Sequence, residues 1–190
     1  MELAAVGARG MKRVCLIGVE STGKTTLAPR LAERFGGVVM PEYGREWAET
    51  RGLDFSITNL RAIAHGHLQR RRRLEAARPR LIVEDTDIIM TSAWAAMLHG
   101  ARDPELSALP ADADLYLLFT PDTPWVDDGT RQFVGTDRLR FQTLVEEELA
   151  ARGITPVIIS GSWRARLAGA VTAVARHLDL EPELGAGAPA

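Results

Sequence analysis

Short apolar runs alternate with longer amphipathic stretches along most of the chain. The runs are rich in Val, Ile, Leu and Phe and are bordered by acidic, Pro or Gly residues, which is typical of strands. They predict strands over residues 13–17, 37–40, 80–84, 115–119 and 156–159. Helical periodicity between the runs predicts helices over residues 24–34, 56–77, 86–98, 136–152 and 164–178. This alternation favours an α/β fold in three α/β/α layers, with a mostly parallel sheet covered by helices on both faces.

Length and composition indicate one domain. The chain has 190 residues, 46% of them hydrophobic, and we expect a domain over 11–180 with flexible termini at 1–10 and 181–190. The formal net charge of −2 gives no overall attraction to nucleic acid or anionic lipid, so we expect no nucleic-acid and no membrane partner. A lone cysteine, Cys15, and the lack of a signal or membrane segment favour a cytoplasmic protein.

Residues 18–25 read Gly-Val-Glu-Ser-Thr-Gly-Lys-Thr, directly after the first apolar run. This is the G-x-x-x-x-G-K-[ST] pattern of a phosphate-binding loop, between a strand and a helix as the pattern requires. In such a loop the backbone N–H groups surround a polyphosphate, Lys24 reaches its β/γ-phosphates and the Thr25 hydroxyl faces Mg²⁺. Of the 23 basic residues only Lys12 and Lys24 are lysines. The loop predicts ATP and Mg²⁺ as cofactors.

Carboxylates follow two other predicted strands at the sheet edge where ligands gather in open α/β folds. Asp85 is the candidate for the metal side, opposite Thr25, and a helix N-cap is its alternative role. Glu42 is a candidate to accept the proton of an acceptor hydroxyl, and Arg45 to stabilise the transferred phosphoryl group. An ion pair between these two residues at helical spacing is the alternative.

Residues 125–131, followed by Arg138 and Arg140, have the composition of a mobile lid near 121–140. A glycine hinge at Gly129 and arginines above the phosphates would exclude water from the site.

His67 and Gln69 precede a run of four arginines that lacks interleaved aromatic residues. We interpret the run as a solvated helix face, and His67 as either a ligand contact or a structural residue.

Together these motifs resemble the ribosylnicotinamide kinase domain of NadR-type NAD-biosynthesis proteins. The matching segments, in the same order and approximate spacing, are 18–27, 42–46, 66–69, 85–87, 123–126, 128–131, Arg138 and 141–142. The resemblance runs from about residue 13 to about residue 178 and implies a phosphate-loop kinase fold with a parallel five-stranded sheet. It implies transfer of the ATP γ-phosphoryl group to the 5′-hydroxyl of nicotinamide riboside, giving nicotinamide mononucleotide. The length leaves no room for the nucleotidyltransferase and DNA-binding domains of larger members, so we expect neither activity.

The resemblance also implies a role for each site residue. The nucleotide-binding residues are Gly18, Ser21, Thr22, Gly23, Lys24, Thr25 and Thr26, with Thr25 and Asp85 on the metal side. The catalytic residues are Lys24, Glu42, Asp85, Arg131 and Arg138. The acceptor-binding residues are Glu42, Tyr43, Arg45, His67, Gln69, Asp87 and Trp125. Trp125 and Tyr43 would offer aromatic faces to a cationic ring. A kinase for another nucleoside and a nucleotide-gated regulatory ATPase are the alternatives.

Overall fold

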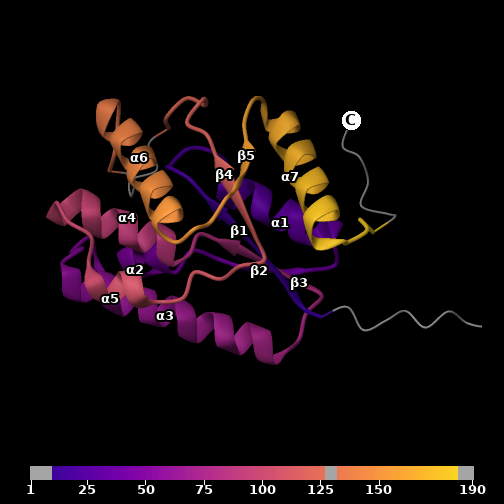
Figure 1. Cartoon of the computed structure of the whole chain (residues 1–190), viewed down its shortest axis with the longest axis horizontal. Coiled ribbons are helices and arrows are strands. Elements are labelled where there is room, and N and C mark those ends of the chain that lie inside the picture. The colour runs from indigo at the N-terminus through magenta and orange to yellow at the C-terminus, as the bar shows by residue number, and fades with distance from the viewer. Residues whose placement is uncertain (1–9, 127–131, 184–190) are drawn as a thin grey trace, which may run out of the picture.

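The computed structural model describes residues 10–126 and 132–183 and contains a five-stranded sheet between two layers of helices (Figure 1). The strands are β1 (Lys12–Ile17), β2 (Val38–Met40), β3 (Leu81–Asp85), β4 (Leu115–Phe119) and β5 (Val157–Ile159). Their order is β2-β3-β1-β4-β5, and all four neighbouring pairs are parallel. The predicted parallel five-stranded sheet is confirmed, and each predicted strand begins and ends within one residue of the observed one.

Seven helices surround the sheet in the described part of the chain. They are α1 (Lys24–Arg34), α2 (Tyr43–Arg51), α3 (Ile57–Ala76), α4 (Ile88–His99), α5 (Pro104–Ala108), α6 (Thr136–Ala151) and α7 (Trp163–Leu178). The five predicted helices are confirmed to within two residues at each end. The prediction missed α2 and α5. None of the residues of α2 is buried, so it lacks the apolar stripe on which a periodicity argument depends, and α5 has only five residues.

The central strand β1 contributes to the core on both faces of the sheet. Val14 and Leu16 point to one face, where α1 and α7 pack, and Cys15 and Ile17 point to the other, where α4 and α6 pack. All four side chains are fully buried. This explains why the strands read as continuous apolar runs. A third cluster of buried residues joins α3, α4 and α5.

The parallel strands bring the segments that follow β1, β2 and β3 to one edge of the sheet. The phosphate-binding loop begins there with Gly18, whose φ of 127° and close approach to β4 require glycine, since a Cβ would lie 2.4 Å from the Phe119 carbonyl oxygen.

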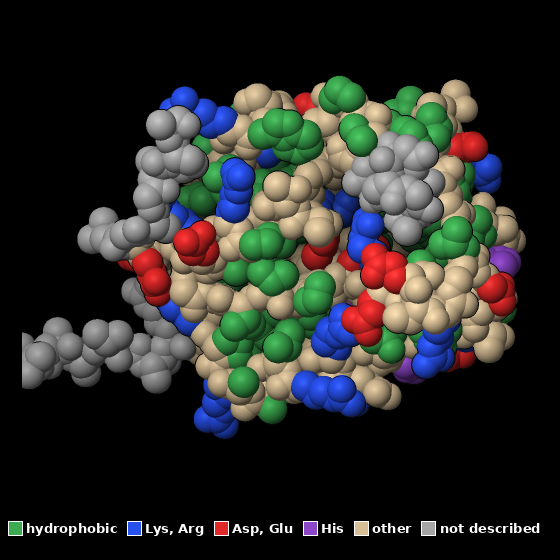
Figure 2. Space-filling model, turned by 180° about the vertical axis from the view of Figure 1, so that it is seen from behind, with side chains coloured by type: hydrophobic (Ala, Val, Ile, Leu, Met, Phe, Trp, Pro, Cys, Tyr) green, Lys and Arg blue, Asp and Glu red, His purple; other side chains and the backbone are tan. Residues whose placement is uncertain are grey.

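On the side of the molecule shown in Figure 2, basic and acidic side chains are interspersed. Within the described residues, no helix is both long and apolar enough to span a bilayer.

Candidate active site

The phosphate-binding loop is closely packed around the side chain of Lys24. The Lys24 ammonium donates hydrogen bonds to the carbonyl oxygens of Gly18 at 2.6 Å and Val19 at 2.9 Å, and Thr22 Oγ1 donates to Val19 O at 2.8 Å. Gly23, at the N-terminus of α1, has a φ of 89°, and a Cβ there would lie 2.2 Å from the Trp163 ring. The loop therefore has the backbone of a phosphate cradle, at the positive end of a helix dipole.

The segment after β4 is held against this loop. Thr123 Oγ1 donates to Ser21 O at 2.7 Å, and the Val126 N–H donates to Ser21 Oγ at 2.9 Å. Arg138, from α6, donates to the carbonyl oxygens of Glu20 and Thr123, both at 2.9 Å. This geometry gives Arg138 a positioning role between the two segments, and its contact with a transferred phosphoryl group stays a prediction. Arg131 and the predicted hinge at Gly129 lie outside the described residues.

Glu42 and Arg45 meet at the N-terminus of α2. Glu42 is the residue before the helix, and its Oε2 lies 3.8 Å from Nε of Arg45. Burial and the neighbouring charge of Asp85 raise the pKa of Glu42 to about 7. A carboxyl group with a pKa near 7 can accept or release a proton near neutral pH. The ion pair with Arg45, which was the alternative role for Glu42, is therefore compatible with a catalytic role for Glu42.

Three polar residues follow one another at the end of β3. The Asp85 side chain is buried, and its Oδ1 has no hydrogen-bond partner among the described residues. Thr86 has a φ of 70°, a strained conformation for a β-branched residue, and strain of this kind is often found at functional sites. Asp87 accepts hydrogen bonds from the Ile89 N–H at 2.9 Å and from the Tyr116 hydroxyl at 2.7 Å. Asp87 therefore caps α4, and the alternative cap role for Asp85 is wrong.

His67, on α3, lies between the cavity and the sheet. Its Nε2 lies 3.3 Å from Oε2 of Glu84, whose other oxygen accepts a hydrogen bond from Arg13 at 3.2 Å. Glu84 is thus a buried, paired carboxylate. Gln69 is exposed, because two residues along a helix turn a side chain about 200° away from His67. The structure does not bring Gln69 to the site.

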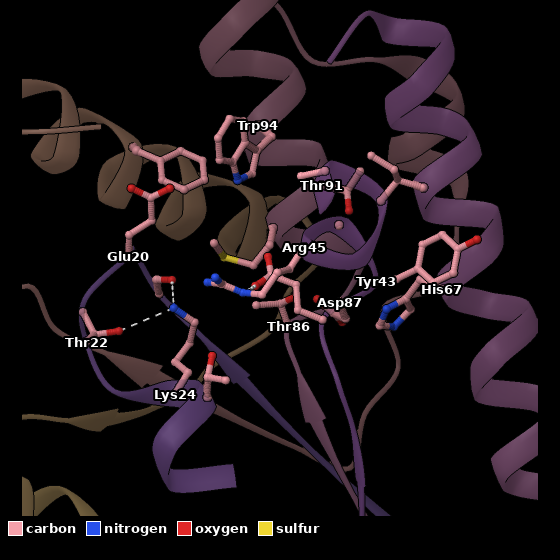
Figure 3. A pocket seen from close by; sticks show the side chains of 18 of the residues that line it. Glu20, Thr22, Lys24, Tyr43, Arg45, His67, Thr86, Asp87, Thr91 and Trp94 are labelled. Carbon is pink, nitrogen blue, oxygen red and sulfur yellow. Dashed lines mark hydrogen bonds and ion pairs between the residues drawn. The ribbon is translucent and has the colours of Figure 1, made fainter. Parts of the chain in front are cut away.

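One cavity brings most of the predicted residues together (Figure 3). The predicted residues that line it are Gly18, Ser21, Thr22, Gly23, Lys24, Thr25, Thr26, Glu42, Tyr43, Arg45, His67 and Asp87. Asp85 is not in the lining, although its charge acts on Glu42. Trp125 is partly buried and also lies outside the lining.

Several other residues line this cavity that were not among the predicted site residues. They are Glu20, Gly44, Ala48, Phe55, Leu60, Ile63, Thr86, Met90, Thr91, Trp94 and Phe141. The Trp94 ring packs against the rings of Phe55, Phe133 and Phe141, with centroids 5.1, 4.7 and 5.6 Å away. Helical spacing contained the signal for Trp94, which follows Asp87 by seven residues on the same helix face.

Comparisons with known proteins agree with this geometry. A family model described as AAA domain matches residues 13–166. The trifunctional NAD biosynthesis/regulator protein NadR of Escherichia coli (strain K12) is 31% identical over 151 residues, which are 76% of this chain and 37% of NadR. The NadR of Salmonella typhimurium is 32% identical over 151 residues, again 76% of this chain and 37% of NadR. The chain thus spans well under half the length of these curated relatives.

Two solved structures have similar folds. A crystal structure of NadR protein in complex with NR superposes with a TM-score of 0.77 and 26% identity, over 92% of this chain and 53% of that one. Thymidylate kinase from Ehrlichia chaffeensis superposes with a TM-score of 0.60 and 16% identity, over 87% of this chain and 97% of the kinase. The second likeness concerns the fold alone, and it places the chain's architecture among the phosphate-loop kinases.

Proposed function

The chain belongs to the AAA domain family, and we propose, on its similarity to NadR, that it is an ATP-dependent kinase that phosphorylates the 5′-hydroxyl of nicotinamide riboside. In this reaction the bond from the γ-phosphorus to the bridging β-phosphate oxygen breaks, and a bond to the 5′-oxygen of the acceptor forms. The products are ADP and nicotinamide mononucleotide. The kinase domain would comprise residues 11–180, with its lid near 121–140.

The observation that carries this proposal is the composition of the cavity. The phosphate-binding loop with Lys24 forms one part of its wall, and Glu42 with Arg45 forms an adjoining part. Aromatic and apolar side chains from α3, α4 and α6 extend the cavity beyond these charged groups. A kinase needs such a compartment for an acceptor beside the nucleotide, whereas a nucleotide-gated ATPase has no use for one.

Each group has a task that fits its chemistry. The loop N–H groups and Lys24 bind the β- and γ-phosphates and stabilise the charge of the transferred group. Glu42, with a pKa of about 7, accepts the proton of the 5′-hydroxyl, and Arg45 holds the phosphoryl oxygens beside it. Exclusion of water by the cavity wall limits hydrolysis of ATP.

Thr25 and Asp85 are the residues that would hold Mg²⁺. The buried, unpartnered Oδ1 of Asp85 fits a cation, and hydroxyl and carboxylate oxygens are ligands that Mg²⁺ prefers. The described residues contain no cluster of three or more His, Cys, Asp or Glu side chains suited to a metal, which agrees with an ion held largely by phosphates and water. When bound, Mg²⁺ neutralises phosphate charge.

The acceptor follows from the NadR resemblance, and a substrate comparison tests it. The experiment measures ATP-dependent phosphorylation of nicotinamide riboside, uridine, cytidine, adenosine and thymidine at fixed ATP and Mg²⁺. We expect the highest kcat/KM for nicotinamide riboside. A neutral nucleoside that matches it would overturn the acceptor assignment and leave the kinase assignment in place. ATP hydrolysis without phosphorylation of any of them would favour the regulatory ATPase.

A further inference from the structure

Three consecutive peptide carbonyls of the phosphate-binding loop accept hydrogen bonds from side chains that lie far away in the sequence. The carbonyl oxygens of residues 20–22 accept, in this order, from Arg138 at 2.9 Å, from Thr123 at 2.7 Å and from Arg166 at 3.4 Å. The donors belong to α6, to the segment after β4 and to α7. Three separate parts of the chain therefore hold one short loop.

Hydrogen bonds to these carbonyls also set the direction of the N–H groups of the loop. A peptide group is planar and trans, so the C=O of one residue and the N–H of the next residue point in opposite directions. Since Ser21 O is directed to Thr123, the Thr22 N–H points to the other side of the loop. Thr22 lies beside Lys24 at the cavity, with its Oγ1 3.5 Å from the ammonium (Figure 3). The outside donors thus occupy the carbonyl side of the loop and leave its N–H side for a ligand.

The backbone of Ser21 needs support of this kind. Its φ of 59° lies in the left-handed region, which is unfavourable for residues that carry a Cβ. Such a conformation persists where the surrounding structure fixes it. Thr123 does so through the Ser21 carbonyl, and the Val126 N–H donates to Ser21 Oγ at 2.9 Å. The conformation of the loop at Ser21 therefore depends on the segment after β4.

Thr123 is the donor that can be replaced with the least disturbance elsewhere. Arg166 is fully buried and also pairs with Asp122, and Arg138 also donates to Thr123 O at 2.9 Å. Replacement of either arginine would break several contacts. The Thr123 side chain is partly buried, and its Oγ1 makes the shortest of the three bonds to the loop and a longer contact of 3.5 Å with Arg138. Valine has the same shape without the hydroxyl group.

We propose that Thr123 is a positioning residue for the phosphate-binding loop, and that its hydroxyl holds the Ser21 peptide group so that the Thr22 N–H faces the phosphates of the nucleotide. This inference rests on the proposed function, since it assigns those phosphates to the N–H side of the loop. The competing role for Thr123 is to tether only the segment after β4. Loss of such a tether would shift that segment without changing the affinity for the nucleotide.

Binding of ADP in the presence of Mg²⁺, measured by calorimetry without an acceptor, separates these roles. We expect Thr123→Val to raise the Kd for ADP about three- to tenfold, because one hydrogen bond that orients the loop is lost. Thr123→Ala also lacks the hydroxyl and should give a similar increase. Thr123→Ser keeps the hydroxyl and should stay within about twofold of the wild-type chain. Thr143→Val removes an exposed hydroxyl from α6 and should leave the Kd unchanged.

Kinetics and stability provide two further readouts. In Thr123→Val the KM for ATP should rise by the same factor as the Kd for ADP, whereas the KM for the acceptor and the melting temperature of the unliganded chain should change little. An unchanged Kd for ADP in Thr123→Val, or an equal increase in Thr123→Ser, would overturn the inference.

The same measurements separate the inference from the proposed function. If the wild-type chain binds ADP but phosphorylates no nucleoside, the proposed function is overturned, and the ADP titrations of the Thr123 variants still decide the role of Thr123. If the wild-type chain does not bind ADP, both are overturned.

Discussion

The imidazole Nε2 of His67 lies 3.3 Å from Oε2 of Glu84, and both side chains are buried. Glu84 also accepts a hydrogen bond from Arg13, so one carboxylate joins β1, β3 and α3 beneath the cavity. Because an ionised carboxylate only accepts hydrogen bonds, this contact requires a proton on Nε2 of His67. Glu84 is therefore a positioning residue for His67.

Replacement of Glu84 should affect both stability and acceptor binding. We expect Glu84→Gln to lower the free energy of unfolding by about 1–3 kcal/mol, since Arg13 loses a buried charged partner. The KM for the acceptor should rise more than kcat falls, because the orientation of His67 is no longer set. Chemical denaturation and steady-state kinetics measure these effects, and ¹⁵N chemical shifts of His67 report its tautomer.

An exposed pair provides the control for this variant. Glu105 lies 3.0 Å from His65, and both side chains are about half exposed. Glu105→Gln should change the free energy of unfolding by less than about 1 kcal/mol. Equal effects of Glu84→Gln and Glu105→Gln would refute a special role for the buried pair.

Removal of the loop lysine should abolish most of the activity. We expect Lys24→Ala to reduce kcat at least about a hundredfold, because its ammonium stabilises charge on the transferred phosphoryl group. The melting temperature should change little. Lys12→Ala, at a partly exposed position in β1, is the matched control and should retain normal turnover. Turnover near the wild-type rate in Lys24→Ala would contradict the kinase assignment.

The two carboxylates near the phosphate-binding loop should respond differently to Mg²⁺. Asp85→Asn should raise the Mg²⁺ concentration that gives half-maximal rate, since a charged ligand becomes neutral. Glu42→Gln should lower the rate even at saturating Mg²⁺, because it removes the proton acceptor. Titrations of initial rate against Mg²⁺ distinguish the two effects. If Asp85→Asn gives the wild-type curve, Asp85 has no part in metal binding.

The rate should increase with pH as Glu42 ionises. A pKa of about 7 leaves the carboxyl group mostly protonated at pH 6 and mostly ionised at pH 8, so kcat should rise about tenfold over this interval. Glu42→Gln should give a nearly flat profile at a lower rate. A profile with the same rise in Glu42→Gln would assign the pH dependence to another group.

The same pKa predicts how stability varies with pH. The folded-state pKa of Glu42 lies above its ordinary value of 4.5, so the folded chain binds more protons than the unfolded chain between these two values. The contribution of Glu42 to stability is therefore fully present below about pH 4.5 and decreases as the pH rises through 7. Glu42→Gln should remove this decrease, which denaturation at pH 5 and pH 8 would detect.

Much of the fold follows from local patterns in the sequence. Apolar runs and helical periodicity predict all five strands and the five longest helices, because burial imposes a period on the side chains. The prediction failed for α2, where no residue is buried, and for α5, which has only five residues. The phosphate-binding loop is also readable from sequence, since its backbone N–H groups and Lys24 come from eight consecutive residues.

The sequence alone thus determined the five strands, the five longest helices and the phosphate-binding loop, all of which depend on neighbours along the chain. Only the tertiary structure decided which distant side chains share the cavity. It brings His67 to the cavity and leaves Gln69 exposed, and it places Trp94, which the sequence did not single out, in the cavity lining. The reason is physical: helix rotation and packing between layers place a side chain in or out of a cavity, and both depend on contacts between residues far apart in sequence.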